Sequence, residues 1–163
     1  MYEQIVVGTD GSQRAHLAVD AAISLAQQYG ATLHVVHAHH VISAAHAAAG
    51  ADVGVAPVDV IEANAGIHEE GQAICDQAVK RAAQAGINAE AHCVGGDAAE
   101  ALIHVAETTG ADLIVVGNRG MEGVRRFLLG NVPNKISHHA PCSVLIVRTT
   151  PVTRPAREQA PRD

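Results

Sequence analysis

The sequence predicts an α/β domain built on a five-stranded parallel sheet that is covered by helices on both faces. Five short aliphatic segments, such as residues 5–9 (IVVGT) and 111–117 (ADLIVVG), suit strands buried on both faces. They alternate with segments in which apolar residues recur at helical spacing, and parallel neighbours require such crossover connections. A chain of 163 residues with 48% apolar residues fits one domain.

The boundaries of these elements follow from capping residues. Ser12 or Asp10 can cap the first helix, Gly30 can end it, and Asp97 suits the N-cap of the third helix. The strands are expected at residues 5–9, 31–38, 87–94, 111–117 and 143–148, and the helices at 12–29, 61–85, 97–109 and 132–139.

Two segments fall outside this alternation. Residues 39–60 are rich in Ala and Gly without a clear period, which predicts a long, partly flexible connection. Residues 150–163 hold three prolines and little apolar content, so we expect a disordered tail after a domain that spans 1–149.

Composition excludes several classes of protein. A net charge of −6, with 11 basic against 17 acidic residues, argues against a nucleic-acid binder. The three cysteines form no C-x-x-C pair, which argues against a disulfide framework or zinc site and suits a reducing compartment. No leader-like or membrane-spanning apolar run occurs, so we expect a cytoplasmic protein with no membrane partner.

A ligand site is expected where the strands end. Open parallel sheets bind ligands beyond the carboxyl ends of their strands, where the loops GTDGS, HAHH and GNRG are predicted to lie. Gly117, Gly120 and Gly130 permit positive φ and close backbone approach, and the helix that follows adds free N–H donors. Together these features predict an anion cradle. No P-loop and no G-x-G-x-x-G after the first strand is present.

Three segments, VVGTDGS, ADLIVVGNRG and LLGNVPNKISHHAPCSVLIV, resemble the universal stress protein family over residues 3–149. The glycine spacing is similar to that family's ATP-binding signature, G-x2-G-x9-G followed by Ser or Thr. The resemblance implies a single-domain, Rossmann-like three-layer sandwich of strand order 3-2-1-4-5, and a homodimer paired through the last strand. It also implies ATP or cyclic AMP as ligand, with Mg²⁺ as a companion of ATP.

The resemblance also implies the nucleotide-binding residues. Thr9 and Asp10 correspond to the positions near adenine and ribose, and Ala38 to a backbone contact with adenine. The ribose and phosphate loop corresponds to Val116, Gly117, Arg119 and Gly120, and the phosphate turn to Gly130, Asn131 and Val132.

Two residues depart from the signature. Asn131 replaces the Ser or Thr, which removes a hydroxyl but keeps side-chain donors and an excellent N-cap. Pro133 lacks an N–H, so the helix start has one donor fewer. We expect weakened rather than abolished binding. Arg119, Arg125 and Arg126 could neutralise phosphate, although the last two are more simply read as solvated.

Chemistry beyond nucleotide binding is not expected. The cluster His37, His39, His40 and His46 suggests metal, yet strand alternation places His40 apart from His37 and His39, and no carboxylate or cysteine completes a ligand set at a recognisable spacing. No catalytic residue is identifiable. The sequence therefore favours a nucleotide-binding stress sensor with an unknown protein partner; the alternatives are a dimeric interaction module without nucleotide and a weak ATPase.

Overall fold

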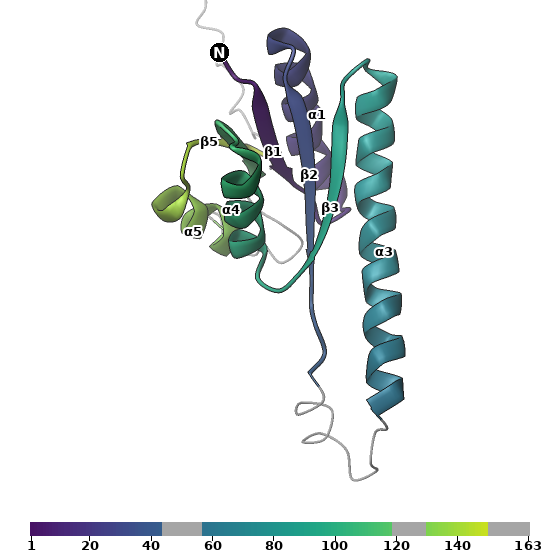
Figure 1. Cartoon of the computed structure of the whole chain (residues 1–163). Helices are drawn as coiled ribbons and strands as arrows, with labels where there is room; N and C mark the ends of the chain where they lie inside the picture. The colour runs from purple at the N-terminus through teal and green to yellow at the C-terminus, as the bar shows by residue number, and fades with distance from the viewer. Residues whose placement is uncertain (44–56, 119–129, 150–163) are drawn as a thin grey trace, which may run out of the picture.

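The computed structural model describes residues 1–43, 57–118 and 130–149. It contains a five-stranded, all-parallel sheet of order β3-β2-β1-β4-β5 (Figure 1), which confirms the predicted fold class and strand order. The elements in chain order are β1 Gln4–Gly8, α1 Gln13–Tyr29, β2 Thr32–His39, α3 Pro57–Gln84, β3 Ala89–Gly95, α4 Ala98–Thr109, β4 Leu113–Gly117, α5 Asn131–His139 and β5 Ser143–Val147.

Predicted caps define the helices that flank the site. The Ser12 hydroxyl accepts a hydrogen bond of 3.1 Å from the N–H of Ala15, and Gly30 ends α1 with a left-handed φ of 69°. In α4, Asp97 accepts from the N–H groups of Ala99 and Glu100 at 3.0 Å. Both N-cap predictions are therefore confirmed.

The predicted start of α3 at residue 61 is wrong. The helix begins at Pro57, and its first turn contains Asp59. Proline suits the first turn because its φ is already helical, and an acidic residue there complements the helix dipole. The expected connection is correspondingly shorter, and its residues 44–56, like the predicted tail at 150–163, lie outside the described residues.

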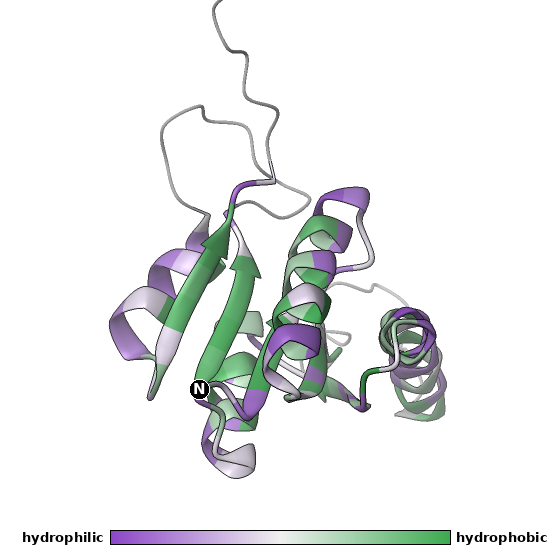
Figure 2. Cartoon of the chain, turned by 90° about the horizontal axis from the view of Figure 1, so that it is seen from above, coloured by the Kyte–Doolittle hydropathy of each residue, from purple (hydrophilic) through white to green (hydrophobic). Residues whose placement is uncertain are grey.

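The sheet separates two apolar layers. On one face, α1 and α3 pack against side chains such as Ile5, Val7 and Leu33. On the other, α4 and α5 cover Val6 and Ile114. Figure 2 shows the strands mainly in green, the colour of apolar residues, and the helices with both green and purple sides. Small alanines on the inner sides of α1 and α4 let these helices approach the sheet closely.

The chain changes direction at the centre of the sheet. From β1 it builds outward through β2 to β3, and α4 then carries it back across to β4 on the other side of β1. The carboxyl ends of β1 and β4 are neighbours, with Val7 paired to Val115. Such a switch point leaves a crevice beyond the strand ends. In the described part of the chain, no helix is long and apolar enough to cross a membrane.

Candidate functional site

A solvent-open cavity lies at the switch point, beyond the carboxyl ends of the strands. The ends of β1, β2 and β4 form its floor, and residues of α4 and α5 line it as well. Six residues predicted to bind nucleotide line it together: Thr9, Asp10, Ala38, Val116, Gly117 and Val132. Residues that are distant in the sequence thus meet where the glycine pattern indicated a ligand.

The other four predicted residues divide into two groups. Gly130 and Asn131 lie at the start of α5, immediately before the lining residue Val132, but are not themselves part of the cavity wall. Arg119 and Gly120, like Arg125 and Arg126, lie outside the described residues.

The loop after β1 is held in place by its own polar groups. The N–H of Thr9 donates to the carbonyl of Val36 at 2.9 Å, and the Thr9 hydroxyl accepts from the N–H of Gly11 at 3.2 Å. The carboxylate of Asp10 accepts from the N–H of Ser12 at 2.9 Å, which ties it to the start of α1. Gly11 allows this turn because its φ is +75°. Asp10 therefore reaches the cavity as a positioned, half-buried carboxylate.

An apolar wall closes the cavity on the side of α4. Ala98 and Leu102, one helical turn apart, line it together with Val36 and Pro133. Leu102 lies so close to Gly8 that a Cβ on Gly8 would be 3.0 Å from Leu102 Cδ1. Glycine at this strand end lets the wall approach the floor. Sequence periodicity does not reveal this wall, because it depends on where α4 crosses the end of β1.

Asn118 connects the strand ends beside the cavity. Its N–H donates to Val147 at 2.8 Å, and its carbonyl accepts from the N–H of Gly130 at 3.1 Å. Its side-chain oxygen accepts from both the N–H and the hydroxyl of Thr149, at 2.8 and 2.9 Å. These bonds hold the beginning of α5 and the end of β5 against β4. Asn118 was not predicted as a site residue, because only tertiary contacts distinguish it within GNRG.

One prediction about the phosphate turn is wrong. Asn131 is not the N-cap of α5: Gly130 is, because its carbonyl accepts from the N–H of Asn134, and no side chain caps this helix. Nor does Gly130 adopt positive φ; its φ is −59°. Glycine is favoured there by close approach instead, because a Cβ would lie 3.3 Å from the carbonyl oxygen of Asn118.

The orientation of α5 is fixed by α4. The ammonium of Lys135 lies 3.2 Å from a carboxylate oxygen of Asp97 and 2.9 Å from one of Glu100. The Glu100 N–H, followed by Lys135 and the Ala99 N–H, holds the pKa of Asp97 below its usual value, against a smaller opposing effect of burial. The carboxylates of Glu100 and Asp97 raise the pKa of Lys135. These ion pairs join α5 to the first turn of α4.

The charge of the cavity limits what it can bind by side chains alone. Among the described residues that line it, Asp10 is the sole charged one. An anion there would depend on the first N–H groups of α5, those of Asn131 and Val132, which have no acceptor within the helix. Pro133, the third residue of the helix, contributes none.

The sequence of the whole domain matches one family model, the universal stress protein family, over residues 1–148. This chain belongs to the universal stress protein family. It is 33% identical to the universal stress protein YxiE of Bacillus subtilis over 91% of its own length and 100% of that protein. Its identity to the universal stress protein Rv1636 of Mycobacterium tuberculosis is 37%, over 91% of this chain and 98% of the other.

The solved structures that resemble this chain include a universal stress protein with a bound ligand. Its crystal structure is of a complex with cAMP, and it is 32% identical to this chain with a TM-score of 0.67. The match covers 91% of this universal stress protein and 99% of the other chain. The fold and nearly all of the domain are therefore common to the two proteins.

The fold brings a cysteine to the histidine cluster that no sequence spacing indicates. His37 and His39 share a face of β2, as predicted, and His39 also lies beside His68 of α3 and Cys93 of β3. The three positions are far apart in the sequence, so no spacing pattern could reveal them.

Proposed function

We propose that this universal stress protein binds an adenine nucleotide, ATP or cyclic AMP, in the cavity between the ends of β1 and β4. The supporting observation is that six of the residues implied by the family resemblance line a single cavity at the switch point of the sheet. The related protein of known structure in complex with cAMP supports the same ligand class.

The walls of the cavity suit the parts of an adenosine differently. The apolar surface of Ala38, Val36 and Leu102 would hold the base, and the carboxylate of Asp10 would accept hydrogen bonds from ribose hydroxyls. The N-terminus of α5 would take the phosphate through the N–H groups of Asn131 and Val132. Asn131 and Pro133 would weaken this contact relative to a Ser or Thr signature without abolishing it.

A magnesium ion fits this site only as a companion of ATP. Mg²⁺ requires oxygen ligands and keeps several waters, and Asp10 is the carboxylate that the described cavity wall offers. Its other ligands would be phosphate oxygens and water.

The proposed activity is sensing rather than turnover. Asn118 forms hydrogen bonds with Gly130, Val147 and Thr149, which we call the Asn118 clasp. It links the start of α5, where phosphate would bind, to the end of β5. A nucleotide that favours one arrangement of this region would shift the population of a surface that a protein partner recognises. A cytoplasmic location is part of the proposal, and the three free thiols suit a reducing compartment.

We also propose that two copies form a homodimer paired through β5. This strand is at the edge of the sheet, and its side chains are half-buried or exposed, with Leu145 36% exposed. A second copy would cover this apolar edge, which an all-parallel sheet rarely leaves open. Light scattering should give twice the chain mass, and Leu145→Arg should give monomers. Leu17→Arg, on α1 and 49% exposed, is the control and should remain dimeric; monomers in the parent protein would refute the dimer.

The test of nucleotide binding is a titration with ATP and with cyclic AMP, after analysis of nucleotide carried through purification. Gly117→Asp adds a negative side chain at the cavity floor and should reduce affinity at least tenfold, whereas Gly66→Asp, in open space on α3, should bind like the parent. Equal binding by both variants would place the ligand elsewhere. Absence of any affinity would favour the interaction module, and phosphate release that depends on the intact cavity would favour the weak ATPase.

A further inference from the structure

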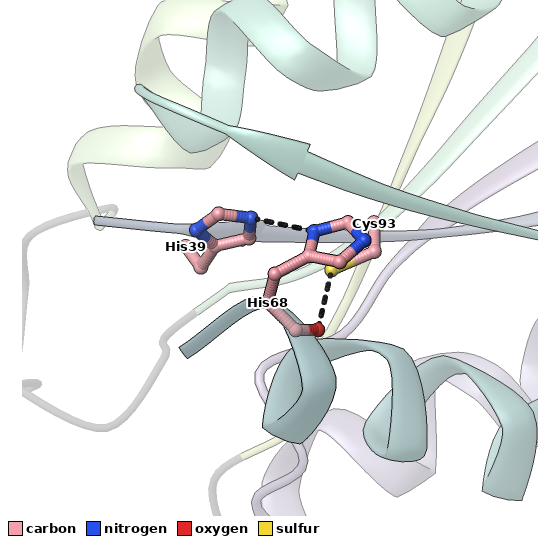
Figure 3. A group of neighbouring side chains, drawn as sticks. All are labelled: His39, His68 and Cys93. Carbon is pink, nitrogen blue, oxygen red and sulfur yellow. Dashed lines mark hydrogen bonds between the residues drawn. The ribbon is translucent and has the colours of Figure 1, made fainter. Parts of the chain in front are cut away.

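A second group of functional side chains lies on the opposite face of the sheet from the nucleotide cavity. His39 from β2, His68 from α3 and Cys93 from β3 point toward one another (Figure 3). One ligand atom from each lies within 4.8 Å of the others. His68 is exposed, and His39 and Cys93 are half-buried, so the group is open to solvent.

The hydrogen bonds of this group leave His39 in the state of a metal ligand. Its Nδ1 faces the carbonyl of His40 at 3.3 Å, and a carbonyl can only accept, so Nδ1 carries the proton. The Nε2 lone pair is therefore directed at His68 Nδ1, 3.2 Å away. An Nδ1–H bonded to a backbone carbonyl is the usual outer contact of a metal-bound histidine.

A glycine of α3 leaves the space that the Cys93 side chain occupies. Gly71 lies one turn after His68, and a Cβ there would be 2.7 Å from Cys93 Sγ and 2.8 Å from His37 Cδ2. The helix therefore lacks a side chain where the thiol needs room. The Cys93 thiol donates a weak hydrogen bond of 3.5 Å to the carbonyl of His68. Burial raises the pKa of this thiol, so without a metal it is protonated at neutral pH.

We propose that His39, His68 and Cys93 form a binding site for a zinc-like transition metal, with two imidazoles, one thiolate and an open fourth position. Ligand atoms around tetrahedral zinc lie about 3.3–3.6 Å apart, given bonds of about 2.1 Å to nitrogen and 2.3 Å to sulfur. The two imidazole nitrogens lie 3.2 Å apart and share a hydrogen bond donated by His68 Nδ1, so metal binding requires this proton to move to His68 Nε2 and the thiol to shift by about 1 Å. The mixed nitrogen and sulfur donors favour zinc over magnesium or calcium.

A second cluster, His34, Glu90 and His92, is a weaker candidate. His34 is buried, and both of its ring nitrogens are engaged, Nε2 with Gln4 Oε1 at 2.8 Å and Nδ1 with His92 at 3.1 Å. Metal binding there would break a hydrogen bond in the interior. This cluster therefore serves as an internal comparison for the exposed one.

The experiment is a titration of the full chain with Zn²⁺, and with Co²⁺ as a spectroscopic probe. We expect one tightest equivalent, with a thiolate-to-cobalt charge-transfer absorption and release of a proton from Cys93 on binding. His68→Gln and Cys93→Ser should each weaken this equivalent more than tenfold, and Cys93→Ser should remove the absorption. His68 is exposed, so its variant should retain the parent's circular dichroism.

Matched controls separate this site from general binding by 11 histidines. His104→Gln replaces another exposed helical histidine, and Cys142→Ser another half-buried cysteine; both should bind Zn²⁺ like the parent. Equal weakening in the control and site variants would overturn the proposal. A loss caused by His92→Gln but not by His68→Gln would assign the metal to the other cluster and would also overturn it.

Discussion

The backbone N–H of Gly130 donates a hydrogen bond of 3.1 Å to the carbonyl oxygen of Asn118. This bond joins the residue after β4 to the N-cap of α5. The Asn118 side chain extends the connection to Thr149, beyond β5. The glycine signature therefore has a structural function, the closure of β4 on α5, in addition to its proposed role beside phosphate.

Removing the Asn118 side chain should destabilise the domain. Asn118→Ala removes the acceptor of two hydrogen bonds from Thr149, which is buried. We expect a loss of about 1–2 kcal/mol in the free energy of unfolding, measured with urea. Asn118→Asp keeps an acceptor oxygen and should lose less. An alanine variant as stable as the parent would show that the clasp contributes nothing.

A methyl group at Gly130 should disturb the same contact. Gly130→Ala places a Cβ 3.3 Å from the carbonyl oxygen of Asn118. This contact is tight, so the hydrogen bond between the two residues must lengthen or shift. We expect it to destabilise by about 1 kcal/mol. Gly66→Ala is the control, because Gly66 lies in α3 with open space around it, and it should stabilise by about 0.5–1 kcal/mol. If urea unfolding showed that both variants change the free energy of unfolding in the same direction, this interpretation would be contradicted.

The N-cap of α4 should contribute measurably to stability. Asp97→Ala removes two hydrogen bonds to the helix start, and we expect a cost of about 0.5–2 kcal/mol. Asp97→Asn keeps the cap but loses the solvent-screened ion pair with Lys135, so its cost should be smaller. The pKa of Asp97 is lowered, so its ionic contribution is present at neutral pH and is lost as the pH falls below about 4. Thermal unfolding of both variants at pH 7 and pH 3 measures the difference.

His34 should make the domain less stable in mild acid. Burial, followed by the neighbouring His92, lowers the pKa of His34, and the carboxylate of Glu90 opposes this only partly. The unfolded chain then binds more protons than the folded one as the pH falls below about 6.5, so the free energy of unfolding decreases in that range. Between pH 7.5 and 5.5, the parent should lose more stability than His34→Gln. Equal losses would remove His34 as the cause.

Local sequence features predicted the elements whose causes are local. The aliphatic runs of β1 and β4 have no polar interruption, and Ser12, Gly30 and Asp97 meet the capping requirements of their own helices. Asn131 failed as a cap because Gly130, one residue earlier, is also an acceptable N-cap, and the contact with Asn118 selects it.

The candidate sites depend on contacts that no local pattern contains. Parallel pairing of β2 with β3 places Cys93 opposite His37 and near His39, and the packing of α3 through Gly71 brings in His68. The cavity wall at Leu102 likewise depends on where α4 crosses the end of β1. Residues of the proposed nucleotide cavity were predicted because a family resemblance supplied the tertiary information.

The most direct test of nucleotide binding is the map of backbone amide shifts when ATP is added to ¹⁵N-labelled protein. We expect saturable shifts at the amides of Gly8, Thr9, Ala38 and Val132, which line one cavity at the ends of two strands and the start of a helix. The amides of His68 and Cys93, on the opposite face, should move little. No saturable shift, or shifts confined to surfaces away from the cavity, would contradict the account.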